Sequence, residues 1–231
     1  MIGRLGPIAP GSTIVDVGCS TGYLLEDIAT AAPGAALIGV DLIAAGLRKA
    51  RAAVPDARLI RADACALPLA DASVDAVATI NLLEHIADDR AALMEIARVL
   101  RPGGRMVAVV PAGPGTFDYY DRFLGHERRY RRHELAGKVI QAGLLPLEDG
   151  YIGSLLYPAF WLVKRHNRLR HDGLRGDALT ARVAADIGRT KDSRAGYLAW
   201  RLEDRLARFG VRLPFGIRSF VVACREDRAG R

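Results

Sequence analysis

A turn bracketed by two glycines, between a hydrophobic strand and a helix, constrains this chain more than any other segment. The apolar run Thr13–Val17 is followed by Gly18-Cys-Ser-Thr-Gly22, after which helical spacing of apolar residues begins. Glycine lets the backbone approach a ligand closely, and the N-terminus of the next helix offers unpaired N–H groups to a carboxylate or phosphate. Any tight strand-to-helix turn also favours glycine, so the turn alone fits a nucleotide site and a purely structural turn equally well.

Acidic residues lie at or near the ends of three successive predicted strands. Asp16 lies in the first strand, Asp41 follows Ala36–Val40, and Asp63 follows Arg58–Arg61. Open α/β sheets bind ligands outside the carboxyl ends of their strands, and an acid after the second strand is placed to accept hydrogen bonds from ribose hydroxyls. The three acids together favour the nucleotide interpretation of the turn.

Asp16 separates two nucleotide cofactors. It lies two residues before Gly18, where a carboxylate would repel a pyrophosphate but could hold an ammonium group, directly or through water. The turn also lacks the G-x-G-x-x-G spacing of dinucleotide sites. Both observations favour S-adenosylmethionine over NAD.

With these residues, the sequence resembles the class I S-adenosylmethionine-dependent methyltransferases, and more narrowly their type 11 methyltransferase domain. The resemblance covers residues 12 to about 145 and implies S-adenosylmethionine as cofactor and S-adenosylhomocysteine as its product. Its motifs, in the family's order, are Val15–Gly22 (VDVGCSTG), Val40–Asp41, Ala62–Ala64, Leu67–Leu69, Ser73–Val77, Leu83–Ile86 and Leu100–Gly104.

The resemblance also implies a set of cofactor-binding residues. Gly18, Cys19 and Gly22 would line the methionyl end, and Asp41 would bind the ribose. The full set is Asp16, Gly18, Cys19, Ser20, Gly22, Asp41, Leu42, Asp63, Ala64 and Asn81, with Leu42 against one adenine face and Asp63 and Ala64 at the adenine edge. Cys19 fits a small filler better than a nucleophile. The family usually has glycine at the position of Ser20, a departure that bears on local backbone geometry more than on binding.

Alternating strand and helix patterns predict an α/β fold with a doubly wound, mostly parallel, seven-stranded Rossmann-like sheet. A helical insertion precedes the last strand. The predicted strands are Thr13–Val17, Ala36–Val40, Arg58–Arg61, Val74–Ile80, Arg105–Val110, Leu147–Ile152 and Phe220–Cys224. The predicted helices of the core are Gly22–Ala31, Ala44–Val54, Asp88–Leu100 and His133–Ala142, and Pro102–Gly104 is expected to turn the chain into the fifth strand.

We expect one methyltransferase domain over residues 1–231. Within it, residues 12–112 form the cofactor-binding core, residues 113–132 an active-site loop, and residues 153–218 a helical insertion that covers the substrate. The three cysteines show neither C-x-x-C spacing nor a metal pattern with the histidines, so we expect reduced thiols and no metal. No signal peptide is recognised, and a cytoplasmic location is expected.

The long segment after the fifth strand is the expected acceptor-binding loop. Its stretch Leu124–Tyr130 (LGHERRY) looks like an L-G-H-x-R-R-Y element found in a subset of type 11 methyltransferases. Long loops at this edge of a sheet usually carry function. The predicted substrate-binding residues are Tyr119, Tyr120, Arg128, Arg129 and Tyr130.

Methyl transfer needs a base only when the acceptor carries a proton, and histidine is the natural candidate. His126 is the first candidate and His85, after the fourth strand, the second. Structural alternatives remain for each. His126 could brace the loop through Glu127 or Asp121, and His85 could cap or pack the short helix that contains it.

Basic charge is concentrated in the second half of the chain, and it bears on which partners that half could bind. Residues 1–115 hold 10 Lys/Arg and 12 Asp/Glu, whereas residues 116–231 hold 23 and 14. This excess fits a solvated basic face, an anionic acceptor or an anionic membrane surface, to which the chain would be peripheral. A recognised RNA-binding module is not found, which disfavours nucleic acid.

The insertion contains an apolar segment and an amphipathic one. Ile152–Val163 is too short to span a bilayer and is either a core helix, a wall for a greasy acceptor or a membrane-interface segment. Tyr197–Phe209 has helical amphipathic spacing and is expected to pack on the sheet or on a second subunit in a homodimer.

These observations predict methyl transfer to a small or lipid-like acceptor, with O-methylation slightly favoured over N- or C-methylation. One alternative is a prenylated or polyprenyl-linked acceptor at a membrane surface. Another is a scaffold or cyclase that binds S-adenosylmethionine without transferring its methyl group.

Overall fold

The computed structural model describes residues 2–171, 173–190, 194–211 and 213–226. The chain divides into two compact units, which are described one at a time. Unit 1 comprises Met1–Val109, Glu134–Asp149 and Phe220–Arg231, and unit 2 comprises Val110–His133 and Gly150–Ser219.

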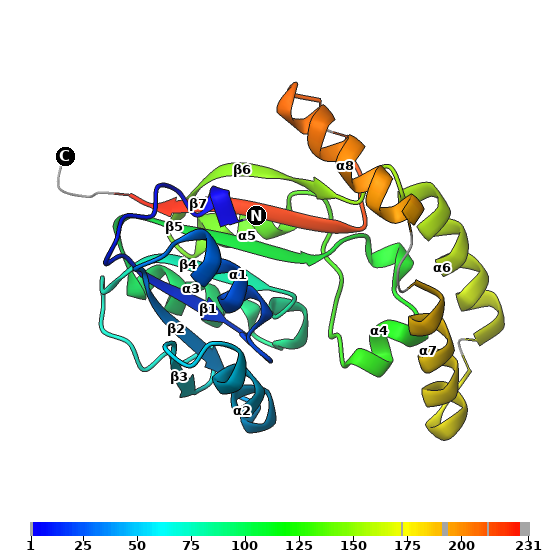
Figure 1. Cartoon of the computed structure of the whole chain (residues 1–231). Coiled ribbons are helices and arrows are strands. Elements are labelled where there is room, and N and C mark those ends of the chain that lie inside the picture. The colour runs from blue at the N-terminus through cyan, green and yellow to red at the C-terminus, as the bar shows by residue number, and fades with distance from the viewer. Residues whose placement is uncertain (1, 172, 191–193, 212, 227–231) are drawn as a thin grey trace. The chain divides into compact units, whose positions relative to one another are not determined.

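A seven-stranded sheet forms the centre of unit 1, in the order β3-β2-β1-β4-β5-β7-β6 (Figure 1). The pairs β1–β2, β1–β4, β2–β3 and β4–β5 are parallel. The strands are β1 (Thr13–Val17), β2 (Ala36–Asp41), β3 (Arg58–Arg61), β4 (Val74–Ile80), β5 (Leu100–Pro111), β6 (Leu144–Ile152) and β7 (Arg218–Arg225). The predicted fold class is confirmed.

Continuous burial of the central strands explains why helices cover both faces. Ile14, Val15 and Val17 of β1 are at most 1% exposed, the pattern of a strand buried on both sides. Helices α1 (Tyr23–Ala31) and α2 (Ala44–Ala53) contact each other, as do α3 (Asp89–Val99) and α5 (Glu134–Gln141). Figure 1 shows the two pairs on opposite faces of the sheet.

A residue of strand β7 also binds the C-terminal end of α3. The Arg225 guanidinium donates from Nη1 to the carbonyl oxygens of Ala97, Arg98 and Leu100 at 3.1, 2.7 and 2.6 Å. The last carbonyls of a helix have no partner within the helix, and a basic side chain there also complements the helix dipole. Arg225, in the last strand of the chain, therefore stabilises α3, which lies more than a hundred positions earlier in the sequence.

The segment Pro102–Gly104 differs from its prediction. The sequence pattern predicts a turn before a strand that starts at Arg105, whereas β5 already begins at Leu100 and these residues lie where its pairing with β4 is irregular. The register shifts between Val74 and Ala76 of the partner strand. A Cβ on Gly104 would lie 2.8 Å from the Arg101 carbonyl oxygen, so the bulge needs glycine there.

Unit 2 is mainly helical, as predicted for the insertion. It contains the 3-10 helix η3 (Pro114–Thr116) and the α-helices α4 (Tyr119–Leu124), α6 (Tyr157–His171), α7 (Gly176–Thr190) and α8 (Arg194–Arg208). Helix α4 lies within the expected active-site loop and contacts both α6 and α7. Its N-terminus has a capping box. The Asp118 side chain accepts the backbone N–H of Asp121, and the Asp121 side chain accepts the backbone N–H of Asp118.

Helix α6 corrects one sequence interpretation. Its buried residues are polar, Lys164 and Asn167, whereas Trp161, Leu162 and Val163 are 40%, 60% and 57% exposed. The interpretation of this apolar stretch as a core helix is therefore wrong. The helix buries its polar residues Lys164 and Asn167 and exposes the apolar side chains. None of the helices in the described ranges combines the length and hydropathy needed to cross a bilayer.

Two glycines provide a matched test of the packing in unit 1. A Cβ on Gly39 of β2 would lie 2.7 Å from Leu25 Cδ1 and 2.8 Å from both Cys19 Sγ and Leu59 Cδ2, whereas one on Gly137 of α5 would meet nothing within 4 Å. We predict that Gly39→Ala lowers the free energy of unfolding by about 1–3 kcal/mol through overpacking. Gly137→Ala should instead raise it by about 0.5–1 kcal/mol. Urea denaturation measures both, and equal effects would contradict the packing described.

Candidate functional site

The glycine turn after β1 is held closely from two sides. Gly18 and Gly22 have φ of +85° and +87°, a region that side chains disfavour. A Cβ on Gly18 would lie 2.9 Å from Leu82 Cβ, and one on Gly22 3.0 Å from Ala50. The Gly18 N–H donates to the Val40 carbonyl at 2.7 Å. Leu82 just beyond β4, Ala50 of α2 and Val40 at the end of β2 all hold the turn, so both glycines are needed for their backbone conformation and for space.

Asp41, at the end of β2, faces this turn. Its Oδ2 accepts the Ser20 N–H at 2.8 Å and its Oδ1 accepts the Ile43 N–H at 2.7 Å. A carboxylate has about four acceptor positions, so each oxygen keeps capacity for a ligand hydroxyl. Ser20 has φ of +46°. Glycine adopts this conformation most readily, which explains why the family usually has glycine at this position. The serine adopts this backbone conformation and turns its N–H to Asp41.

Further candidate residues follow β2, β3 and β4 at the same edge of the sheet. Asp63 accepts the Cys65 N–H at 2.8 Å, and Leu42 is 57% exposed. The Arg61 Nε donates to the Leu42 carbonyl at 3.0 Å and holds that residue. Asn81 follows β4 with φ of +54°, and its N–H donates to Val109 at 2.8 Å. Ala64 is buried next to Asp63 in the chain.

Burial strongly affects two ionisable groups here, Asp16 of β1 and Cys19 within the turn. Burial, and then the nearby Asp41 carboxylate, raises the pKa of Asp16 to about 7. Burial, followed by the charges of Asp16 and Asp41, raises the pKa of Cys19 to about 12. Cys19 is therefore a protonated thiol near neutral pH, in agreement with a filler and not a nucleophile. Asp16 is a buried carboxyl group whose charge a cation would stabilise.

His85, the second base candidate, lies in unit 1. It ends the 3-10 helix η2 (Leu83–His85), its side chain is exposed, and its N–H donates to the Leu82 carbonyl at 2.9 Å. Leu82 is the residue that packs on Gly18. His85 is therefore hydrogen-bonded, through its backbone, to the residue that packs against the glycine turn.

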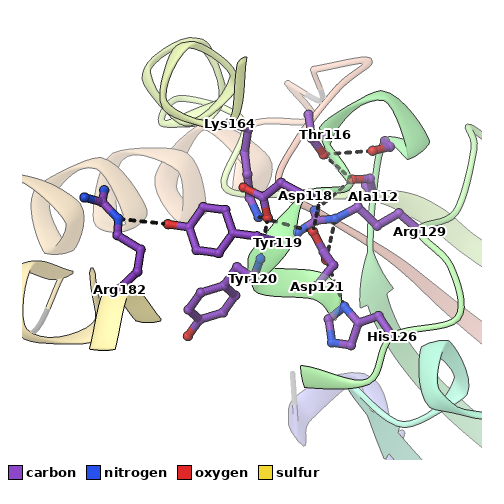
Figure 2. A network of polar contacts seen from close by, with 11 residues as sticks. Ala112, Thr116, Asp118, Tyr119, Tyr120, Asp121, His126, Arg129, Lys164 and Arg182 are labelled. Carbon is purple, nitrogen blue, oxygen red and sulfur yellow. Dashed lines mark hydrogen bonds and ion pairs between the residues drawn. The ribbon is translucent and has the colours of Figure 1, made fainter. Parts of the chain in front are cut away.

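In unit 2, the first base candidate belongs to a buried network centred on Asp121 (Figure 2). Asp121 Oδ1 lies 2.9 Å from His126 Nδ1 and accepts from Arg129 Nε at 2.7 Å. Asp121 Oδ2 accepts from the Asp118 N–H at 3.0 Å and from Lys164 Nζ at 3.2 Å. Burial alone would raise the pKa of this carboxyl group, but the His126 hydrogen bond and the Arg129 and Lys164 charges hold it well below its usual range.

Lys164 and Asp118 extend the network into α6. Lys164 Nζ donates to Asp118 Oδ1 at 2.7 Å, and the Tyr120 N–H donates to the same oxygen at 3.0 Å. Asp118 Oδ2 is buried and has no hydrogen-bond partner among the described residues. The Lys164 ammonium also lies 5.5 Å from the centroid of the Tyr120 ring, within the range of a cation–π contact.

The predicted substrate-binding residues divide into buried and accessible groups. Tyr119 and Tyr130 are fully buried and Arg129 is 8% exposed, whereas Tyr120 and Arg128 are partly exposed. The Tyr119 hydroxyl accepts from Arg182 Nε of α7 at 3.3 Å (Figure 2). The side chains of Tyr119 and Arg129 thus contact protein groups in this structure, and Tyr130 is buried.

Sequence reasoning missed three members of this network as functional candidates: Asp118, Lys164 and Arg182. Asp118 and Asp121 are spaced three apart at the start of α4, a capping signal that could have been recognised. Lys164 lies in a run of basic residues, where nothing distinguishes the one that turns inward.

Comparisons with known proteins agree with this fold. Residues 15–108 match the family model described as "Methyltransferase domain". A probable S-adenosylmethionine-dependent methyltransferase of Mycobacterium tuberculosis is 32% identical over 146 residues, which are 62% of this chain and 52% of that protein. A demethylmenaquinone methyltransferase of Thermus thermophilus is 38% identical over 122 residues, 48% of this chain and 56% of that protein.

A solved structure supports the fold alone. The geranyl diphosphate C-methyltransferase of Streptomyces coelicolor A3(2) superposes with a TM-score of 0.64 at 16% identity, covering 96% of this chain and 75% of that chain. The chain spans about half the length of the curated relatives it matches. Residues 15–108 are therefore similar to the methyltransferase domains of S-adenosylmethionine-dependent enzymes.

The raised pKa of Asp16 predicts a pH-dependent stability in the absence of cofactor. Between the unfolded value of 3.8 and the folded value of about 7, the folded protein holds a proton that the unfolded chain releases. The contribution of Asp16 is therefore fully present below about pH 4 and is lost as the pH rises through about 7. Relative to Asp16→Asn, whose amide does not titrate, the free energy of unfolding should fall by roughly 2 kcal/mol between about pH 5 and about pH 8.

Urea denaturation of the two proteins at both pH values measures this difference. Only the difference between the two profiles is assigned to Asp16, because all other titrating groups are shared. Parallel profiles would show that Asp16 titrates with an ordinary pKa.

Proposed function

We propose that this protein transfers the methyl group of S-adenosylmethionine to a small or lipid-like acceptor, with an oxygen favoured as the methylated atom. The observation that carries the proposal is the Asp41 carboxylate, fixed by two backbone N–H groups beside the glycine turn. Positive φ at Gly18 and Gly22 and the close packing around them leave this backbone ordered before a ligand arrives. Such preorganisation reduces the entropic cost of binding.

The residues at this edge fit the parts of the cofactor. Asp41 would accept the ribose hydroxyls, the exposed side chain of Leu42 would cover one adenine face, and Asp63 with Ala64 would meet the adenine edge. Asp16 would hold the methionyl ammonium, directly or through water, because a buried carboxyl group with a pKa of about 7 gains charge readily beside a cation. Gly18 and Cys19 would line the methionyl end.

The cofactor supplies a methyl group already activated on a sulfonium. The protein then has to bind, orient and exclude water, and to accept a proton when the acceptor is a hydroxyl. We propose His126 for that proton and His85 as the second candidate. Asp121 Oδ1 lies 2.9 Å from His126 Nδ1. We propose that the carboxylate accepts a hydrogen bond from Nδ1–H, which leaves the lone pair of the ring on Nε2, the form that a base requires.

A transfer assay tests this proposal. Purified protein with isotope-labelled S-adenosylmethionine and fractionated cell extracts should yield S-adenosylhomocysteine together with a labelled small molecule. Asp41→Ala should abolish transfer through loss of cofactor binding, which calorimetry reports directly. His126→Gln should retain that binding but lower turnover by about 10²–10⁴-fold.

The control for Asp41→Ala is Asp56→Ala, which removes an exposed acid before β3 and should leave cofactor affinity unchanged. Unchanged affinity in Asp41→Ala would refute the ribose assignment. Cofactor binding without S-adenosylhomocysteine formation from any acceptor would instead favour the non-methylating scaffold or cyclase. Unchanged turnover in His126→Gln would make His126 a loop brace.

A second candidate, a prenylated acceptor methylated at a membrane surface, is favoured by the outer face of α6. Leu162 and Leu169 are 60% and 79% exposed, and Arg165 lies over the exposed Trp161 ring at 5.5 Å. The helix contains basic residues but no acidic ones. Exposed apolar side chains flanked by arginines favour an anionic bilayer surface, and the similarity to a demethylmenaquinone methyltransferase supports this class of acceptor.

Vesicle flotation tests the second candidate. The protein should float with vesicles that contain phosphatidylserine and remain unbound with pure phosphatidylcholine. Leu162→Glu and Arg165→Glu should each reduce the bound fraction severalfold, since about 1 kcal/mol is lost for each basic residue near such a surface. The matched controls are Ile140→Glu, at a 60% exposed position of α5, and Arg48→Glu of α2. Equal losses in the controls, or absence of binding, would contradict a role for α6.

A further inference from the structure

We infer that Asp121 and Lys164 are positioning residues for His126: Asp121 fixes the imidazole directly, and Lys164 fixes it through Asp121. The inference rests on the proposed role of His126 as base. It adds a helix of the insertion, α6, to the groups that determine how that base is presented. The contacts that carry it all lie within unit 2 (Figure 2).

Asp121 determines which ring nitrogen of His126 holds the proton. An ionised carboxylate only accepts hydrogen bonds, so His126 Nδ1, at 2.9 Å from Asp121 Oδ1, has to be the donor. The backbone strengthens this arrangement, because the His126 N–H donates to the Asp121 carbonyl at 2.9 Å. Two contacts to one residue fix both the position and the tautomer of the ring.

The Asp121 carboxylate is itself held at both oxygens. Arg129 Nε binds Oδ1 at 2.7 Å, and Lys164 Nζ binds Oδ2 at 3.2 Å. The Asp118 N–H supplies a second hydrogen bond to Oδ2 at 3.0 Å. With donors on both oxygens the carboxylate plane cannot rotate freely, and its fixed plane sets the direction of the hydrogen bond to His126.

Lys164 is suited to act through Asp121. It lies 43 residues after Asp121 in the chain, and its side chain is 8% exposed. The ammonium bridges Asp118 and Asp121 at 2.7 and 3.2 Å, where solvent barely competes. The carboxylates of Asp118 and Asp121 face the cations of Lys164 and Arg129, so the network holds two charges of each sign beside His126. Loss of the lysine would leave a buried negative charge uncompensated beside the ring.

A merely structural brace between α4 and α6 would make a different prediction. Such a brace would contribute to stability, but the ring of His126 would not depend on it once the protein is folded. A positioning role requires that the protonation pattern and hydrogen exchange of His126 change in folded variants. Nuclear magnetic resonance of isotope-labelled histidine measures both, and His126→Gln assigns the signal.

We expect the wild-type protein to show an unprotonated Nε2 and a slowly exchanging Nδ1 proton on His126. Asp121→Asn, which keeps the shape of the side chain, should lose this single tautomer. Once an acceptor is known, it should also lower turnover by up to about 10⁴-fold, as loss of an orienting carboxylate does in serine proteases. Lys164→Met should speed exchange of the Nδ1 proton by at least about tenfold, and Lys164→Arg should restore slow exchange.

Lys138→Met is the matched control. It removes an ion pair of similar length, 2.7 Å to the buried Asp89 in unit 1, and should leave the His126 signals unchanged. An Nε2-protonated ring in the wild type, or unchanged signals in folded Asp121→Asn and Lys164→Met, would overturn the inference. If Lys164→Met does not fold, Lys164→Gln, which removes the charge but keeps a hydrogen-bond donor, takes its place, and unchanged His126 signals in folded Asp121→Asn and Lys164→Gln would overturn the inference in the same way.

The spectra require neither acceptor nor cofactor, so the two proposals can fail separately. Failure to find methyl transfer would refute the proposed function and leave the ring assignment intact. Unchanged spectra together with an inactive His126→Gln would refute only the positioning roles.

Discussion

The close packing of the turn between β1 and α1 determines much of unit 1. Leu82 and Ala50 approach Gly18 and Gly22 so closely that a Cβ there would lie 2.9–3.0 Å from them. These contacts come from the segment after β4 and from α2, and the Gly18 N–H also donates to Val40 of β2, so three elements fix the turn. The same packing turns the Ser20 N–H to Asp41. A strained serine and an oriented carboxylate are thus consequences of one packing constraint.

Unit 2 relies on a different interaction, a buried charge network. Helix α6 directs Lys164 inward to two carboxylates and leaves Leu162 and Leu169 outside, the reverse of an ordinary amphipathic helix. Burying these charges is unfavourable unless each is paired, so the network specifies one arrangement of α4 against α6. We propose that this specificity serves His126 within the network and a lipid surface outside it.

The sequence predicted unit 1 well because its signals are local. Glycines at fixed spacing, apolar runs and acids near strand ends identify the sheet and the residues that gather at its edge. The bulge at Pro102–Gly104 was missed because it depends on the register with β4. In unit 2, Lys164 and Arg182 could not be identified, since their inward orientation follows from tertiary contacts and not from periodicity. The exposed face of α6 was misjudged for the same reason.

The central claim is that S-adenosylmethionine binds at the edge of the sheet formed by the glycine turn, Asp41 and Asp63. A crystal structure with S-adenosylhomocysteine tests it most directly. We expect both ribose hydroxyls on the Asp41 carboxylate, the adenine beside Leu42 and Ala64, and the methionyl end along Gly18 and Cys19. A ligand whose ribose lies away from Asp41, with the glycine turn uncontacted, would contradict it.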